Sequence, residues 1–258
     1  MLIVANWKAY VEDLARAKKL LAVSKRLARQ SQATIVLAPP APLLGALALN
    51  NRSNVAFAAQ DISVTTGGAQ TGEITAGAFE AVGAAYALIG HSERRARGDT
   101  AVSVAEKISH ALAQGLRPIL CVGEPERDAE GRYLSFIREE LTSALSAVAP
   151  RERAEIIVAY EPLWAIGKSA DAAASANDLG EMTLYIRKVL AELLPGRPSP
   201  EASARRGKSS RESLVLYGGS VEPDNIRDLA ASSGLDGFLI GHASVDPRLF
   251  AASVKQLA

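Results

Sequence analysis

The chain has a single cysteine among its 258 residues, Cys121, which excludes an internal disulfide and a cysteine-based zinc cluster. It has no apolar run long enough to cross a bilayer, and its first residues lack the charged and then hydrophobic segments of a signal peptide. Its 29 basic and 28 acidic residues are mixed along the chain, so no global field favours nucleic acid or an anionic membrane. These absences predict a soluble, cytoplasmic protein that binds neither nucleic acid nor a membrane.

Aromatic residues are also few, at 5%, although 48% of the chain is hydrophobic. The interior is therefore built from Ala, Leu, Val and Ile, a composition typical of helices packed on a parallel sheet. A chain of this length buries roughly 70–75% of its unfolded surface, so a large core forms without disulfides or metals. The length alone allows one large α/β domain or two small ones.

Short apolar runs alternate with amphipathic stretches along the whole chain. The runs predict strands at Leu2–Ala5, Thr34–Ala38, Val55–Ala59, Tyr86–Gly90, Pro118–Val122, Ile156–Tyr160, Leu214–Tyr217 and Phe238–Ile240. The stretches predict helices at Asp13–Arg29, Leu43–Leu49, Gly77–Gly83, Thr100–Gln114, Arg132–Val148 and Asn177–Leu194, from Asn225 and after Pro247. Eight such units predict an α/β fold, a (β/α)₈ barrel forming a single domain over residues 1–258. The alternative, a doubly wound open sheet, lacks its glycine-rich turn after the first strand.

In a parallel barrel the residues that follow each strand meet on one rim, where barrel enzymes carry their active sites. Chemically active residue types follow five of the predicted strands. They are Asn6 and Lys8 after the first, His91, Ser92 and Glu93 after the fourth, Glu161 after the sixth, Gly218-Gly219-Ser220 after the seventh and Gly241-His242 after the eighth. Backbone N–H groups after the last two strands of a barrel commonly bind phosphate. The rim therefore predicts catalysis on a phosphorylated substrate.

Each of these residues also has an ordinary interpretation. Glu161 precedes Pro162, which keeps it extended at a strand end, as in any surface connection. Lys8 could form only a structural ion pair with Glu93. His91 could be a hydrogen-bonded core histidine, but it opens a segment that could start a short helix, and the helix N-terminus would keep the ring neutral. Because all of these residues are predicted to meet on one rim, a catalytic role for the set is favoured over the ordinary structural interpretation of each residue.

Two segments resemble the end of a nucleotide-binding loop, Gly167-Lys168-Ser169 and Gly207-Lys208-Ser209. Neither has the first glycine of that motif, so neither predicts a nucleotide site. The second lies in Pro195–Ser213, a stretch rich in Pro, Ser, Gly and Arg that we expect to be a long surface loop.

Seven pieces of sequence, in order and over nearly the whole length, resemble the triosephosphate isomerase family. They are Asn6-Trp7-Lys8, Ala59-Gln60-Asp61, Thr71-Gly72-Glu73, Gly90-His91-Ser92-Glu93-Arg94-Arg95, Cys121-Val122-Gly123-Glu124, Tyr160 to Gly167, and Tyr217-Gly218-Gly219-Ser220-Val221. The resemblance implies an isomerase of glycolysis and gluconeogenesis. Such an enzyme interconverts dihydroxyacetone phosphate and D-glyceraldehyde 3-phosphate through an enediolate and needs no metal or cofactor.

The resemblance also implies roles for individual residues. A glutamate base and a neutral histidine electrophile are the general assignment for this family, here Glu161 and His91. Asn6 would help polarise the carbonyl and Lys8 would offset negative charge. The remaining implied roles are phosphate binding by Gly167, Ser220, Gly241 and His242, a supporting place behind the catalytic residues for Ser92 and for Glu93 as the partner of Lys8, and dimer contacts by Thr71, Gly72 and Glu73. The last group implies a homodimer whose sites depend on assembly.

The resemblance also implies a lid that opens and closes over the site, with Pro162 to Gly167 as its first hinge and tip and Lys168-Ser169 as its far hinge. The chain departs from the family pattern at four places: Lys168-Ser169 at that far hinge, His242 in place of a second glycine, Asp61 in place of an asparagine, and the length of Pro195–Ser213. None of these departures removes a catalytic group. Two alternative functions are a related barrel isomerase of a longer sugar phosphate and a phosphate-binding barrel without catalysis, because a fold does not fix a substrate.

Overall fold

Eight parallel strands form a closed barrel in the computed structural model, which describes residues 1–165, 174–194, 213–232 and 234–257. Each strand pairs with its neighbours in the chain, and the last pairs with the first, with Ile3 opposite Phe238. The strands are β1 (Leu2–Asn6), β2 (Thr34–Ala38), β3 (Ala56–Ala59), β4 (Tyr86–Ile89), β5 (Arg117–Val122), β6 (Ile157–Tyr160), β7 (Val215–Tyr217) and β8 (Gly237–Ile240). The predicted closed barrel is confirmed, and the open sheet is excluded.

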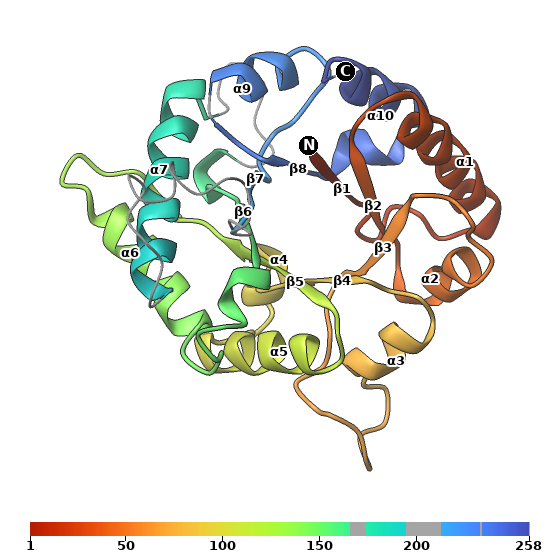
Figure 1. Cartoon of the computed structure of the whole chain (residues 1–258), viewed down its shortest axis with the longest axis horizontal. Coiled ribbons are helices and arrows are strands. Elements are labelled where there is room, and N and C mark those ends of the chain that lie inside the picture. Colours follow the sequence, from red (N-terminus) through yellow and green to blue (C-terminus); the bar gives the residue numbers. More distant parts are fainter. Residues whose placement is uncertain (166–173, 195–212, 233, 258) are drawn as a thin grey trace.

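The helices form a ring around the barrel, except the short α4, which lies inside the ring near β4 and β5 (Figure 1). They are α1 (Leu14–Gln30), α2 (Ala41–Ala48), α3 (Ala76–Ala81), α4 (Ser92–Arg95), α5 (Ala101–Ala113), α6 (Arg132–Ala144), α7 (Ala176–Leu193), α9 (Ile226–Ser232) and α10 (Pro247–Lys255), with single 3₁₀ turns η1 (Arg153–Glu155), η2 (Leu163–Ala165) and η4 (His242–Val245). The predicted helices differ from these by a few residues at their ends. The largest difference is α6, which ends four residues before the predicted Val148 because the chain tightens into turns: the Ser146 N–H bonds the Ser143 carbonyl at 3.2 Å and the Val148 N–H bonds the Leu145 carbonyl at 3.1 Å.

Alternating side chains on the strands make two cores. In β1, Leu2 and Val4 belong to a cluster of buried side chains inside the barrel, whereas Ile3 and Ala5 belong to the larger cluster between the barrel and the helices. Successive side chains on a strand point to opposite faces, so every strand serves both cores. Because both faces are buried, the strands are continuous apolar runs and could be recognised from the sequence.

The segment between β3 and α3 projects away from the barrel (orange, at the bottom of Figure 1). Its base is closed by a hydrogen bond from the Ser63 N–H to the Ile74 carbonyl at 2.9 Å and by a contact of the Ser63 hydroxyl with the Glu73 carboxylate. Residues 66–74 are exposed, and the apolar side chains of Val64 and Ile74 are each 42% exposed. The segment is therefore an ordered projection with apolar surface beyond the body of the barrel.

A cluster of four charged side chains ties the base of this projection to α4 and α5. Lys107 on α5 is 3% exposed, and its Nζ donates to both carboxylate oxygens of Asp61, at 2.8 and 3.0 Å, and of Asp99, at 2.9 and 2.8 Å. Arg94 on α4 places its Nε 2.7 Å from Asp61. Asp61, one of the departures from the family pattern, is thus an ion-pair partner of both cations.

Lys107→Met is expected to destabilise the protein by roughly 3–5 kcal/mol, because it leaves two carboxylates with little compensation in a buried place. The change keeps most of the side-chain volume and removes only the charge. The urea midpoint of unfolding measures the effect. Lys18→Met, at an exposed position of α1, is the matched control and should stay within about 0.5 kcal/mol of the parent chain. Equal midpoints for the two variants would contradict the stabilising role of the cluster.

No helix in the described ranges has the length and hydropathy needed to cross a membrane. The loop predicted at Pro195–Ser213 lies, except for Ser213, outside the described residues, as do Gly167 and Lys168-Ser169 of the predicted lid.

Candidate functional site

Residues after β1 form the first part of the site, in a backbone conformation that the sequence did not reveal. Lys8 has a φ of 46°, in the left-handed region that costs a residue with a side chain about 1–3 kcal/mol. Hydrogen bonds from its own N–H to Asn6 Oδ1 at 3.0 Å and from Gln60 Nε2 to its carbonyl at 2.9 Å hold that conformation. Gln60 also bonds the Ala38 carbonyl, at 2.8 Å, and so links the exits of β1 and β2. Backbone strain held in this way is common at functional sites.

The Lys8 side chain lies between the exits of β4 and β8. Its Nζ donates to Glu93 Oε1 at 2.6 Å, and a Cβ added to Gly241 would lie 3.6 Å from its Cε. Partial burial alone would raise the pKa of Glu93, but the hydrogen bond and charge of Lys8 outweigh it and hold that pKa below its usual value. Lys8 is therefore a held cation beside the Gly241 turn, and its Glu93 partner stays ionised.

His91 caps α4 and is held in one tautomer. Its Nδ1 accepts a hydrogen bond from the Glu93 N–H at 3.1 Å, so in the neutral ring the proton is on Nε2. Nε2 lies 3.4 Å from Oε1 of Glu161. The short helix predicted after His91 is confirmed as α4, and its first turn supplies the donor that fixes the ring. The arrangement leaves Nε2 free to donate its N–H next to a carboxylate.

Glu161 is a buried carboxylate at the end of β6. It is 3% exposed, and its own N–H bonds the Val122 carbonyl at 2.8 Å. Burial raises its pKa above the usual 4.5, although nearby His91 and Lys8 and hydrogen bonds from Cys121 and the Ser92 backbone act to lower it. Its Oε2 has no hydrogen-bond partner among the described residues. A desolvated carboxylate with an unpaired oxygen is suited to taking up a proton.

Two glycines make room for Glu161. A Cβ on Gly218, after β7, would lie 2.7 Å from Glu161 Cγ and 3.0 Å from its Oε1. A Cβ on Gly123, after β5, would lie 1.9 Å from the Glu161 carbonyl oxygen. The neighbouring strands therefore approach the proposed base so closely that no side chain fits between them.

The predicted phosphate-binding residues are placed on the same rim, except Gly167, which lies outside the described residues. Ser220 Oγ donates to the Ala165 carbonyl at 3.2 Å, so the turn after β7 touches η2. Gly241 follows β8 and lies beside Lys8, and η4 begins at His242. The His242 side chain is 74% exposed and lies beside Tyr10, with Nδ1 3.8 Å from Glu222.

Sequence reasoning missed Glu124 as a site residue, although it lies in a quoted motif. Its side chain is fully buried after β5, and its Oε1 accepts hydrogen bonds from the Tyr160 hydroxyl and Trp164 Nε1, both at 2.7 Å. The Leu163 N–H bonds its carbonyl at 3.0 Å. Glu124 thereby anchors η2, the turn that directly follows Glu161-Pro162. The only sequence signal for this role was the position of Glu124, a carboxylate directly after Gly123 at the end of a predicted strand.

The remaining predicted residues divide into two groups. Ser92 and Glu93 lie on α4 next to His91, as expected from the sequence. Thr71, Gly72 and Glu73 lie on the projecting segment between β3 and α3, away from this set of side chains (Figure 1). A site that uses them has to include a second molecule.

Known proteins match this chain over nearly its full length, and they belong to the family that the sequence motifs resemble. A family model described as "Triosephosphate isomerase" matches residues 1–257. A triosephosphate isomerase of Thermus thermophilus is 36% identical over 258 residues, covering 99% of this chain and 98% of the relative. Relatives with the same name from Moorella thermoacetica and Chloroflexus aurantiacus are 35% and 39% identical, covering 98% and 96% of this chain and 97% and 96% of themselves.

Proposed function

Because this chain belongs to the triosephosphate isomerase family, we propose that it interconverts dihydroxyacetone phosphate and D-glyceraldehyde 3-phosphate with Glu161 as its base and His91 as its electrophile. The 3.4 Å contact between Glu161 Oε1 and His91 Nε2 carries the proposal. A proton acceptor and a neutral N–H donor this close can act on neighbouring atoms of one small substrate. The reaction itself follows from the family; the residue roles are our proposal.

Glu161 removes a proton from the carbon beside the substrate carbonyl and returns it to the neighbouring carbon. His91 Nε2–H donates to the carbonyl oxygen as enediolate charge develops there. The hydroxyl proton passes from the neighbouring oxygen to this one, so the old carbonyl becomes the hydroxyl and the old hydroxyl becomes the new carbonyl. Asn6 presents its Nδ2 group as a second donor, because its Oδ1 already accepts the Lys8 N–H. Oriented donors of this kind contribute roughly 3–4 kcal/mol each when water is excluded. The positive charge of Lys8 offsets the negative charge of the intermediate and the phosphate.

The phosphate takes no part in bond making, so its binding energy serves alignment and closure of the site. We propose that backbone N–H groups of Gly167, Ser220, Gly241 and His242 bind it. The outward His242 side chain is compatible with this role because only its backbone is needed. Ser220 is suited to couple phosphate binding to closure, since its hydroxyl touches Ala165 at the start of the lid. Exclusion of water then protects the enediolate from side reactions.

A coupled assay run in deuterated water tests the mechanism together with the activity. A proton held on Glu161 exchanges with solvent, so part of the glyceraldehyde 3-phosphate formed should carry deuterium at the carbon that receives it. Turnover without any deuterium would contradict the exchange of the held proton with solvent. Faster turnover of a four- or five-carbon sugar phosphate would favour the alternative isomerase, and no turnover would favour the non-catalytic phosphate-binding barrel.

We further propose a homodimer in the cytoplasm. The projecting segment between β3 and α3 is ordered and bears exposed Val64 and Ile74, a surface suited to a second copy of the chain. In that arrangement its Thr71-Gly72-Glu73 tip would reach the partner's β1 exit and stabilise the strained conformation there. A reduced single cysteine fits the cytoplasm.

Thr71→Arg is expected to weaken the dimer and lower kcat at least about tenfold together, because a charged side chain would be buried without a partner in the interface. Sedimentation velocity and the coupled assay, at the same protein concentration, measure the two effects. Ser135→Arg, which adds the same side chain at an exposed position of α6, is the control. A Thr71→Arg monomer with full activity would disprove the dependence of the site on assembly.

A further inference from the structure

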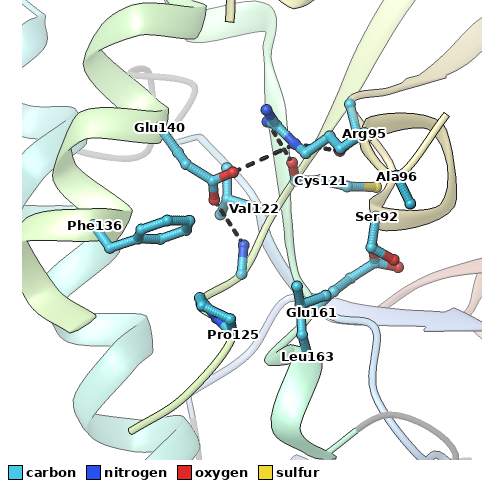
Figure 2. A pocket seen from close by; sticks show the side chains of 12 residues that line it. Ser92, Arg95, Ala96, Cys121, Val122, Pro125, Phe136, Glu140, Glu161 and Leu163 are labelled. Carbon is cyan, nitrogen blue, oxygen red and sulfur yellow. Dashed lines mark hydrogen bonds and ion pairs between the residues drawn. The ribbon is translucent and has the colours of Figure 1, made fainter. Parts of the chain in front are cut away.

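A partly buried carboxylate on α6 lies next to the site and has no part in the mechanism above. The Glu140 side chain is 11% exposed and lines a cavity of about 300 Å³. Glu161, Cys121 and Leu163 line the same cavity, and in Figure 2 the Glu140 carboxylate points toward Arg95 while the Glu161 carboxylate lies on the other side, near Ser92. The lining is mostly apolar, so an ionised carboxylate there loses hydration that its partners have to replace. Its partners therefore indicate what it does.

Glu140 acts first on the exit of β5. Its Oε2 accepts a hydrogen bond from the Gly123 N–H at 2.9 Å. Gly123 is the residue whose backbone packs directly against the Glu161 carbonyl. The hydrogen bond therefore sets how closely the exits of β5 and β6 approach. This distance in turn sets the backbone position of Glu161, to which its side chain is attached.

Arg95 extends the same support toward His91. Its Nε lies 3.3 Å from Glu140 Oε1 and donates to the Gly90 carbonyl at 2.8 Å, and its Nη2 donates to the Cys121 carbonyl at 3.4 Å (dashed lines, Figure 2). Gly90 directly precedes His91 in the chain. One ion pair thus contacts the exits of β4 and β5, the two strands on the His91 side of the proposed base.

We propose that Glu140 and Arg95 are a positioning pair that holds the exits of β4, β5 and β6 at the separation at which Glu161 reaches His91. The proposal rests on Glu161 being the base. Neither member touches the substrate, and both act through backbone groups, Glu140 through Gly123 and Arg95 through Gly90. A misplacement of about 1 Å in such a site can cost roughly 10²-fold in rate.

The charge of the pair acts on the same carboxylate. The titratable and charged groups that face the two carboxylates are Arg95, Glu124 and Glu161 for Glu140, and His91, Lys8 and Cys121 for Glu161. Burial raises the pKa of Glu140, and so does the charge of Glu161, against Arg95 and the Gly123 N–H. Because like charges disfavour one another, we expect the negative charge of Glu140 to act on the pKa of Glu161 in the same direction, and Arg95 without its partner to lower that pKa.

Three variants separate position from charge. Glu140→Gln keeps an acceptor for the Gly123 N–H and removes the charge, and Glu140→Leu removes both. Glu139→Gln makes the same charge change at the exposed neighbouring position and is the control. We expect Glu140→Gln to keep kcat within about threefold and to move the acid limb of the kcat/KM profile down by roughly half a pH unit. Glu140→Leu should lower kcat about tenfold with KM within about twofold.

An unmoved acid limb in Glu140→Gln with a parental kcat in Glu140→Leu would overturn the proposal. So would losses of kcat that follow thermal stability while the acid limb stays in place, because that pattern describes a structural residue. If Glu140→Leu does not fold, the pH profile of Glu140→Gln decides alone. Glu161→Gln, measured alongside, keeps the two hypotheses apart: activity in that variant removes the base assignment, whereas its inactivity beside unaffected Glu140 variants removes only the positioning pair.

Discussion

Glu161→Gln is expected to lower kcat by roughly 10³–10⁴-fold, the upper part of the range for loss of a positioned base. The amide has nearly the same shape as the carboxylate, so KM should change much less, and the buried site should stay intact. Glu80→Gln, an equal charge change at an exposed position of α3, is the control. A loss of less than tenfold in Glu161→Gln would show that another group takes the proton.

Glu161→Asp gives a second measure of the same role. It keeps the carboxylate but draws it back by one methylene, about 1 Å, so we expect a loss of about 10²-fold, between the parent chain and Glu161→Gln. If kcat decreases in the order parent, Glu161→Asp and Glu161→Gln, then Glu161 has to be in the right position as well as carry a negative charge. An aspartate as active as the parent would indicate that the contact with His91 is not needed.

The pH dependence of the parent chain follows from the same burial. Because the pKa of Glu161 is raised, its ionised, proton-accepting form is present above that pKa and is lost as the pH falls through it. We therefore expect kcat/KM to fall on the acid side at a pH above the 4.5 of an ordinary glutamate. The pH profile of kcat/KM for the free enzyme measures this, and an acid limb below pH 4.5 would contradict the raised pKa.

The strands and the rim could be predicted because local sequence determines them. Buried parallel strands are continuous apolar runs, and Pro162 directly after Glu161 marks the place where β6 must end. The position of Glu161 on the rim then follows from the barrel alone, since all strands run the same way. The same reasoning predicted that His91 and Glu161 lie on one rim, but it could not predict that their side chains come within 3.4 Å of each other.

Residues that act across elements could not be predicted in the same way. The left-handed conformation of Lys8 depends on Gln60, which is 52 positions away, and Glu140 reaches Gly123 across 17 positions. Each of these residues, taken alone, fits a solvent-facing position of a loop or helix as well as a supporting role. Only the packed barrel shows which side chains are turned inward, because their partners come from strands and helices that no local pattern connects.

The second large effect on kcat is expected for Gly218→Ala, because Gly218 leaves the space that the Glu161 side chain occupies. In Gly218→Ala the new Cβ would meet Glu161 Cγ at 2.7 Å and Oε1 at 3.0 Å. The carboxylate can rotate away while the backbone stays in place, so we expect a loss of about 10²-fold in kcat with a free energy of unfolding within about 2 kcal/mol of the parent. Gly45→Ala on α2, whose Cβ would meet Val82 at 3.4 Å, is the control and should keep full activity.

A double variant shows whether Gly218 acts through the base. If the alanine only displaces Glu161, it has little left to remove once the carboxylate is gone, so Gly218→Ala should lower the residual kcat of Glu161→Gln by less than about threefold. Losses that multiply instead would mean that Gly218 affects the substrate or the phosphate directly. The strongly sub-multiplicative result is the one we expect, because the atoms nearest the added methyl group all belong to the proposed base.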